Sequence, residues 1–164
     1  MSSPTRWLND DEQHLWRLLL SSQWKLSRAI EESVQQTSNL SYSEFGVLVE
    51  LSEAENRTLR LRDLCMHLEW DRSRASHQVT RMEKRGLVTK EPSPGDGRGV
   101  LVTLTDEGFS RLEAAVPEHV EVVRRMVFDH MKPSSAPVLE EFFSGIIAVR
   151  EASARSEVAD AADD

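Results

Sequence analysis

The sequence has a single cysteine, no long apolar run and no excess of positive charge, and each absence excludes a class of protein. Cys65 has no second cysteine to pair with, so an intrachain disulfide is impossible and a reducing compartment is favoured. No stretch approaches the ~20 apolar residues of a membrane span. The N-terminal MSSPTRWLNDD lacks the basic and apolar segments of a signal peptide. We therefore expect a cytoplasmic protein that does not enter the membrane.

The residue patterns of catalysis and metal binding are also missing. The five histidines include no His-X3-His pair and are accompanied by no cysteine cluster, so a zinc site is not predicted. No glycine-rich phosphate-binding loop precedes a helix, and no Ser-His-Asp pattern is present. We expect no catalytic residues, no metal and no cofactor.

The net charge of −8 is distributed unevenly along the chain. Residues 57–98 contain ten Lys and Arg and six Asp and Glu, which gives +4 and leaves −12 for the rest. A stretch of mixed charge is usually a solvated surface, but an asymmetry of this kind favours a basic binding module on an acidic scaffold.

Hydrophobic periodicity predicts helices before this basic stretch. A long helix is expected over 9–37, where apolar residues recur at steps of three and four and Asn9 or Asp10 can cap the first turn. Ser41 and Glu44 have the spacing of a capping box and open a second helix.

The basic stretch itself has the pattern of a helix-turn-helix followed by a hairpin. A short helix over 61–68 leads through a tight connection to a second helix, which Asp71 or Ser73 can cap. Strands at 87–91 and 100–105 then flank a glycine-rich loop. The fold class that follows is mainly α with a small β-hairpin wing, a winged helix-turn-helix.

Two more helices are predicted after the hairpin. Thr105 caps a long helix over 106–131, which Pro117 should kink, and the last helix begins at Ser134 or Ser135. Apolar residues lie on more than one face of the last helix, so it needs a second surface, and we favour a dimer over packing within one chain. The small, acidic residues 153–164 are expected to be a disordered tail.

The second helix of the helix-turn-helix has an apolar and a polar face. Ala75, Val79 and Met82 share the apolar face, and the opposite face carries Arg, His, Ser and Thr. A major groove admits a helix, and such side chains suit base edges and phosphates. The alternative is an ordinary polar surface helix.

The loop of the hairpin places one arginine among glycines. Gly95, Gly97 and Gly99 permit a tight turn, and Asp96 stands two residues before Arg98, close enough to fix its direction. Arg98 is then suited to a narrow minor groove. The alternative is a flexible solubilising loop.

These features together resemble the MarR family of bacterial transcription regulators. The resemblance is carried by LRDLCMHLEWDRSRASHQVTRMEKRGLVTKEPSPGDGRGVLVTLTDEG, above all VTRMEKRGLV, the Asp-X-Arg of GDGR, and LTDEG. It extends over about residues 10–150, with 60–108 distinctive. At Cys65 and Met66 the family usually has small or aliphatic residues.

The resemblance implies a homodimer whose first and last helices interlock. Each subunit would place its recognition helix in the major groove and its wing arginine, Arg98, paired with Asp96, in the minor groove. The implied division is dimerisation by 1–40 and 106–152, DNA binding by 41–105, and a tail at 153–164. The candidate recognition-helix residues are Arg72, Ser73, Arg74, Ser76, His77, Thr80, Arg81 and Lys84.

The expected function is sequence-specific DNA binding by a homodimeric transcriptional regulator, a repressor, at a pseudo-palindromic operator. The resemblance also suggests a small-molecule effector, with Trp16, Trp24 and Phe45 as candidate lining residues, although aromatic core packing explains each. Two alternatives remain. One is a winged-helix protein-interaction module. The other is a thiol-based oxidant sensor that uses Cys65, although the family's sensing cysteine lies in the first helix, where this chain has none.

Overall fold

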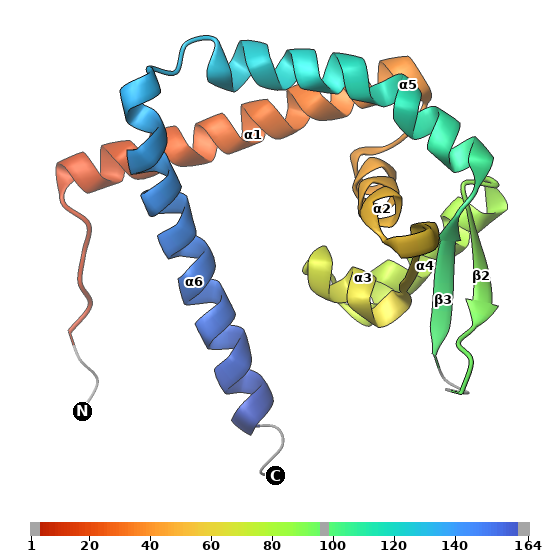
Figure 1. The fold of residues 1–164 in the computed structure, drawn as a ribbon. Helices are drawn as coiled ribbons and strands as arrows, with labels where there is room; N and C mark the ends of the chain where they lie inside the picture. Colours follow the sequence, from red (N-terminus) through yellow and green to blue (C-terminus); the bar gives the residue numbers. More distant parts are fainter. Residues whose placement is uncertain (1–3, 96–98, 161–164) are drawn as a thin grey trace. The chain divides into compact units, whose positions relative to one another are not determined.

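The computed structural model describes residues 4–95 and 99–160, and these form a mainly helical chain with one small sheet (Figure 1). The predicted fold class is confirmed. In chain order the elements are α1 (Asp10–Ser38), α2 (Tyr42–Glu53), a 3-10 turn (Glu55–Arg57), β1 (Thr58–Arg60), α3 (Leu61–His67), α4 (Arg72–Lys84), β2 (Val88–Pro92), β3 (Val100–Leu104), α5 (Asp106–Val123), a π-helical turn (Arg124–Phe128), a 3-10 turn (Pro133–Ser135) and α6 (Ala136–Asp160).

The first helix, α1, begins and ends with side-chain and backbone signals that its sequence contains. Asn9 is the N-cap: its side chain accepts from the Glu12 amide at 2.9 Å, and the Glu12 carboxylate accepts from the Asn9 amide at 2.8 Å. The helix stops where Asn39 adopts a left-handed conformation with φ of 54°. The predicted helix is therefore confirmed to within one residue at each end.

The predicted capping box at the start of α2 also anchors the end of α4. The Glu44 carboxylate accepts from the Ser41 amide at 2.8 Å, and Ser41 Oγ accepts from the Glu44 amide at 3.2 Å. Arg85 donates from Nη1 to both Glu44 carboxylate oxygens at 2.6 Å and from Nη2 to the Asn39 carbonyl at 2.6 Å. Because Glu44 is buried, this ion pair fixes the C-terminal end of α4 against the junction of α1 and α2.

The sheet has three antiparallel strands in the order β1-β3-β2, so β1 extends the predicted hairpin as an edge strand. Thr58 lies opposite Thr103 across β1 and β3, and Val88 lies opposite Leu104 across β2 and β3. One face of the sheet joins the core of the lobe. Core side chains that are almost completely buried include Leu40, Leu48, Leu51, Leu64, Val79, Met82, Leu87 and Val102.

The helix α5 starts against the connection between α4 and β2. Thr105 is its N-cap, accepting from the Gly108 amide at 3.0 Å, and its hydroxyl also lies 2.9 Å from the Leu87 carbonyl oxygen. A Cβ atom on Gly108 would lie 2.2 Å from that same carbonyl oxygen. The close approach of helix to strand therefore requires glycine here.

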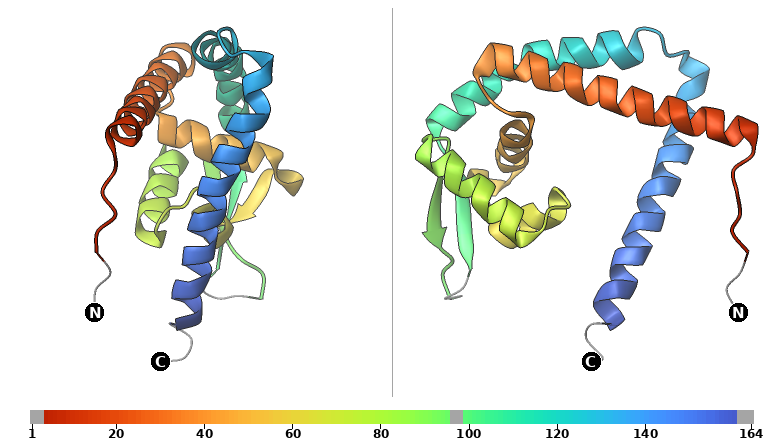
Figure 2. Two further views of the ribbon diagram at one scale, coloured as in Figure 1. Left: turned by 90° about the vertical axis from the view of Figure 1, so that its left-hand side faces the viewer. Right: turned by 180° about the vertical axis from the view of Figure 1, so that it is seen from behind.

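Further along, α5 runs beside α1, as Figure 1 and the two views of Figure 2 show. Ile30 and Val34 of α1 and Leu112 and Val122 of α5 are buried. Pro117 lies inside α5 without ending it, and α5 bends along its length in Figure 1. The helix is shorter than expected, because it changes to a π-helical turn after Val123.

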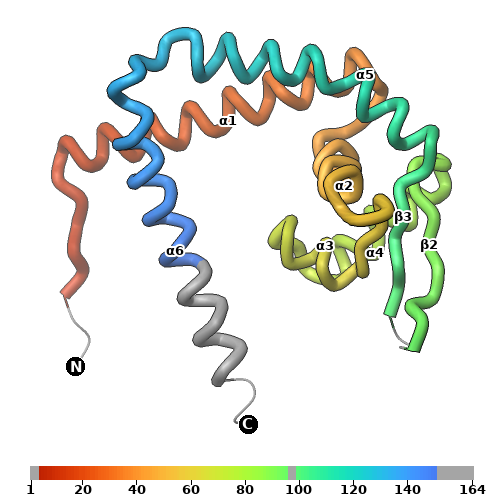
Figure 3. Tube along the Cα trace, in the orientation of Figure 1, coloured from red at the N-terminus to blue at the C-terminus, as the bar shows by residue number. Residues whose placement is uncertain are grey.

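A second compact unit begins at Arg125. Its main element is α6, whose path is traced in Figure 3. The helix α6 spans Ala136–Asp160, and the expected disorder of the tail from residue 153 stays a prediction. Residues 161–164 lie outside the described residues.

Large apolar side chains are exposed along the N-terminal half of α1 and along α6. Several of the leucines whose spacing predicted α1 are therefore not part of this chain's core. The exposed residues at the N-terminus are Trp7, Leu8, Leu15, Trp16, Leu18 and Trp24, and those on α6 are Val138, Leu139, Phe142, Phe143, Ile146, Ile147 and Val149.

The described part of the chain offers neither a membrane-spanning helix nor a metal cluster. None of its helices is both long and apolar enough to cross a bilayer. Within residues 4–95 and 99–160, no three His, Cys, Asp or Glu side chains gather where they could hold a metal ion.

Candidate nucleic-acid interface

The helices α3 and α4 form the predicted helix-turn-helix. Between them Glu69 has a φ of 50°, and the Trp70 amide donates to the Cys65 carbonyl at 2.9 Å. Of the two predicted caps of α4, Asp71 is the one used, since its carboxylate accepts from the Arg74 amide at 2.8 Å. Together with the Arg85 ion pair, this cap fixes α4 at both ends.

The two faces of α4 are divided as predicted. Ala75, Val79 and Met82 are buried, and Gln78, which was not assigned to either face from the sequence, is buried with them. The predicted recognition residues that are exposed are Arg72, Ser73, Arg74, Ser76, His77, Arg81 and Lys84. The helix therefore presents seven of its eight candidate residues to solvent.

Thr80 is the exception, because its side chain is half-buried against the wing. Its hydroxyl accepts from Lys90 Nζ at 3.1 Å, and the same ammonium group pairs with Glu83 at 3.0 Å. Lys90 lies on β2 opposite Val102, so it is on the face of the sheet that packs toward α4. Lys90 was not predicted as a site residue. It stands two residues after Val88, however, so the strand pattern places both side chains on the same face of β2.

Two arginines of the exposed face are held by neighbouring side chains. The Arg74 guanidinium stacks over the Trp70 ring, with 4.4 Å from its central carbon to the ring centroid. Arg81 donates from Nη2 to Gln78 Oε1. These interactions reduce the number of conformations that the arginines give up when they bind a ligand.

The wing is present as the predicted hairpin of β2 and β3. Where its strands meet the loop, the Ser93 amide donates to the Gly99 carbonyl at 2.9 Å, and Gly95 has a positive φ of 76°. Asp96 and Arg98 lie outside the described residues. Their pairing and the direction of Arg98 remain predictions.

The three aromatic residues suggested for an effector pocket have different surroundings. Trp16 and Trp24 are exposed on α1, whereas Phe45 is buried in α2 with its ring 4.9 Å from that of His119. The His119 Nδ1 atom is buried without a hydrogen-bond partner among the described residues, and burial lowers the pKa of this imidazole. An effector site at these residues remains a prediction.

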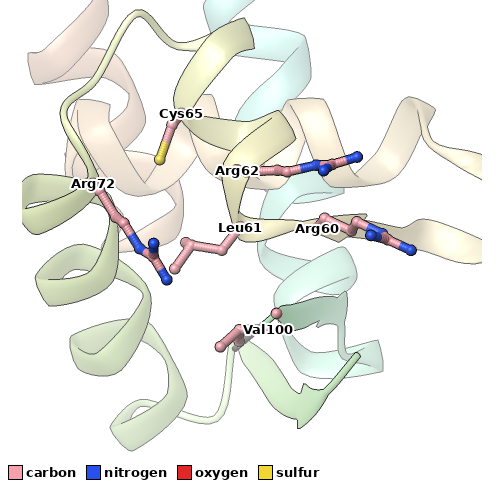
Figure 4. Close-up of a pocket in the computed structure, with 7 residues that line it drawn as sticks. Arg60, Leu61, Arg62, Cys65, Arg72 and Val100 are labelled. Carbon is pink, nitrogen blue, oxygen red and sulfur yellow. The ribbon is translucent and has the colours of Figure 1, made fainter. Parts of the chain in front are cut away.

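A cavity of about 240 Å³ lies between α3, the start of α4 and the loop end of β3 (Figure 4). Its lining includes Leu61 and Cys65 of α3, Arg72 of α4 and Val100 of β3. Cys65 is half-buried, and its sulfur faces this cavity.

Two further arginines, Arg60 and Arg62, line the same cavity. Both belong to the basic stretch of the sequence, but the sequence alone did not predict that β1 and α3 would bring them near Arg72. Burial raises the pKa of the Cys65 thiol, with the positive charge of Arg72 acting in the opposite direction. A raised thiol pKa leaves less of the reactive thiolate at neutral pH.

Comparisons with known proteins agree on one family. The model of the MarR family matches residues 38–99. The organic hydroperoxide resistance transcriptional regulator of Bacillus subtilis is 30% identical over 105 residues, which cover 64% of this chain and 69% of that protein.

Solved structures of two Streptomyces coelicolor proteins share the fold. Sco3205, a MarR family transcriptional regulator solved in complex with DNA, has a TM-score of 0.83 and 36% identity, with 87% of this chain and 90% of that chain covered. AbsC, also a MarR family transcriptional regulator, has a TM-score of 0.85 and 34% identity, with 90% and 99% covered. The family regulates transcription, so the prediction of a non-enzymatic protein is confirmed. The helix-turn-helix, the wing and these similarities show that the chain belongs to the MarR family of transcriptional regulators.

Proposed function

We propose that the protein is a homodimeric repressor in the cytoplasm that binds a pseudo-palindromic operator. In each subunit α4 enters the major groove and the wing enters the adjacent minor groove, with Arg98 at its tip. The observation that carries this proposal is the exposed face of α4, where arginines, a histidine and serines stand on a helix fixed at both ends.

The chemistry of that face suits DNA. Arginine is the side chain best shaped for guanine O6 and N7, and serine and histidine can bind base edges or phosphates. A protein-interaction module would be expected to present apolar residues at the centre of this face, whereas the apolar residues of α4 are buried. The structure of Sco3205 with DNA supports the same choice by similarity.

The dimer is supported by the exposed apolar residues of α1 and α6. An apolar surface of this extent on a single chain is costly in water, and a second copy is the occupant that a two-fold symmetric regulator requires. Two-fold symmetry then predicts half-sites whose centres lie about 10–10.5 base pairs apart, or slightly more.

Repression would be relieved by a small molecule that binds one state of the dimer better than the other. Trp16, Trp24 and Phe45 remain the candidate residues for such a site. The effector shifts DNA affinity only by the ratio of its own affinities for the two states. Oxidant sensing by Cys65 is not favoured, because burial raises the pKa of that thiol.

The test is fluorescence anisotropy with duplex DNA from the region flanking the protein's own coding sequence. We expect one fragment to bind at least ~10³-fold more tightly than random duplex at physiological salt. Arg81→Ala should weaken binding to that fragment. The matched control is Arg28→Ala, which removes an exposed arginine that pairs with Glu32 inside α1. Affinity equal to that for random duplex on every fragment would contradict the proposal.

A further inference from the structure

We propose that Trp70, in the turn between α3 and α4, is a specificity-determining residue. Its ring holds the flat face of the Arg74 guanidinium, so that the edge of this group reads one guanine in the major groove. Trp70 does not touch DNA in this arrangement and acts through Arg74 as a positioning residue. The inference rests on the proposed function and deepens it, because it assigns recognition of one base to one pair of side chains.

The backbone of Trp70 is fixed on both sides. Before it, α3 ends with Glu69 in a left-handed conformation with φ of 50°, and the Glu69 amide donates to the Met66 carbonyl at 3.3 Å. The Trp70 amide then donates to the Cys65 carbonyl at 2.9 Å, which completes a Schellman motif. After it, Asp71 is the N-cap of α4. The turn therefore leaves only the two side-chain torsions of Trp70 to set the direction of its ring.

The same turn places Arg74 beside that ring. Arg74 is the third residue of α4, and its amide donates to the Asp71 carboxylate at 2.8 Å. Its guanidinium carbon lies 4.4 Å from the centroid of the Trp70 ring. A cation over an aromatic face is attracted by the charge distribution of the ring, and tryptophan is the strongest such partner. Because Trp70 is half-buried and Arg74 is exposed, the stack lies at the surface of the recognition helix.

The way in which Arg74 is held determines what it can bind. The stack uses the flat face of the guanidinium and none of its N–H donors, which all lie in the plane of the group. Arg81 is held differently, because it donates from Nη2 to Gln78 Oε1. Of these two arginines, Arg74 is therefore the better suited to the paired donation that guanine O6 and N7 accept.

A fixed guanidinium also discriminates more strongly than a mobile one. Guanine presents two acceptors in the major groove, whereas adenine presents one acceptor and one donor. A mobile arginine that meets adenine can turn to a phosphate instead, and phosphates carry no sequence information. An arginine stacked on a fixed ring loses that alternative, so the wrong base costs both hydrogen bonds. The first residues of a recognition helix are those that contact base edges, which is where Arg74 stands.

The test measures discrimination at each guanine of the operator obtained by in-vitro selection. In both half-sites, each G·C pair in turn is replaced by A·T, or its guanine by 7-deazaguanine, which lacks the N7 acceptor. We expect the A·T replacement at one position to weaken binding by the wild type ~10-fold or more. The Arg74→Ala variant should bind the original and the replaced duplex equally at that position. Arg81→Ala is the matched control and should leave discrimination at that position unchanged.

Variants of Trp70 then test the role of the ring. Trp70→Leu keeps an apolar side chain without an aromatic face, so it should lower discrimination at the position that depends on Arg74 and at no other. Trp70→Phe keeps a weaker face and should give an intermediate ratio. In the Arg74→Ala background, Trp70→Leu should change no ratio. Thermal unfolding checks that each variant is folded, and the order of Trp, Tyr and Phe at this position decides the question if Trp70→Leu does not fold.

The failures of this inference and of the proposed function are distinguishable. If the wild type binds every sequence equally, the proposed function fails. If the wild type is selective and Arg74→Ala removes discrimination at no guanine, only the present inference is overturned. The same holds if Trp70→Leu weakens binding to operator and random duplex by one common factor, because the ring would then serve the fold alone. Equal ratios for Trp70→Phe and Trp70→Leu would also overturn it.

Discussion

Single residues decide how closely the elements of the DNA-binding lobe can approach one another. Gly108 is the clearest case, because α5 begins in contact with the carbonyl of Leu87 at the end of the α4–β2 connection. The Thr105 hydroxyl lies near the same carbonyl and also caps the helix. The glycine of the LTDEG motif therefore sets the path of the chain from the wing into α5.

Gly108→Ala should lower the free energy of unfolding by about 1–3 kcal/mol, since the added methyl group cannot fit without a backbone shift. Urea denaturation at fixed protein concentration measures the change. Gly46→Ala is the matched control, because its Cβ would make only an ordinary contact of 3.7 Å with Leu68. Equal stability of the two variants would show that α5 can move away at no cost.

His119 should make stability depend on pH. Burial lowers the pKa of its imidazole in the folded protein from the ordinary value of 6.5, so the unfolded chain binds the proton more tightly. The contribution to stability is present above pH 6.5 and is lost as the pH falls from that value toward the lower pKa of the folded protein, with a slope of at most about 1.4 kcal/mol per pH unit. Unfolding curves at pH 7.5 and 5.5 should diverge more for the wild type than for His119→Gln. An identical pH dependence would contradict this assignment.

At the scale of elements, α4 is held in place by polar contacts at both ends and along its wing side. Asp71 caps its start, Arg85 joins its end to Glu44, and Lys90 ties its middle to β2. The buried carboxylate of Glu44 is the most costly of these groups to leave unpaired. Positioning of the recognition helix therefore depends on a residue outside the DNA-facing surface.

Arg85→Ala should destabilise the protein by about 1–3 kcal/mol, because it leaves a buried acceptor without its donor. It should also weaken operator binding. Thermal unfolding and anisotropy measure the two effects. Arg85→Lys keeps the charge but not the fork of donors, so we expect an intermediate loss. A fully stable Arg85→Ala variant would mean that Glu44 is satisfied by its capping box alone.

The elements themselves were predictable, because their signals are local. The caps at Asn9, Ser41 and Thr105 and the apolar face of α4 all follow from residues within a few positions of each other. The roles of Lys90 and Arg60 were not predictable in the same way, since they depend on the register of strands that are far apart in sequence. The surroundings of Cys65 were not predictable for the same reason: helical spacing shows its neighbours on α3 but not a cavity bounded by α4 and β3.

At the scale of the whole molecule, α1 and α6 expose large apolar side chains that the described part of a single chain leaves in contact with water. Phe142 and Phe143 contact each other with ring centroids 5.4 Å apart, yet both remain about half exposed. The apolar character of these helices was predictable from the sequence. The sequence did not predict which of these side chains would be buried within the chain, because burial depends on how the helices pack.

Phe142→Glu should convert the protein from a dimer to a monomer and reduce its affinity for operator DNA, because a charge in an apolar interface must be desolvated. Light scattering after gel filtration gives the mass, which should be twice 18.6 kDa for the wild type. Met66→Glu is the control for the mass alone, since it adds the same charge at an exposed apolar residue outside α1 and α6. A wild-type mass of 18.6 kDa would contradict the proposed dimer.

The most direct test of the account is in-vitro selection of duplex DNA by the wild-type protein from a random pool. We expect enrichment of a pseudo-palindrome whose half-site centres are separated by about one helical turn, with specific positions where α4 meets the major groove. Enrichment of no sequence over the starting pool would contradict the central claim that this chain recognises a specific operator as a two-fold dimer.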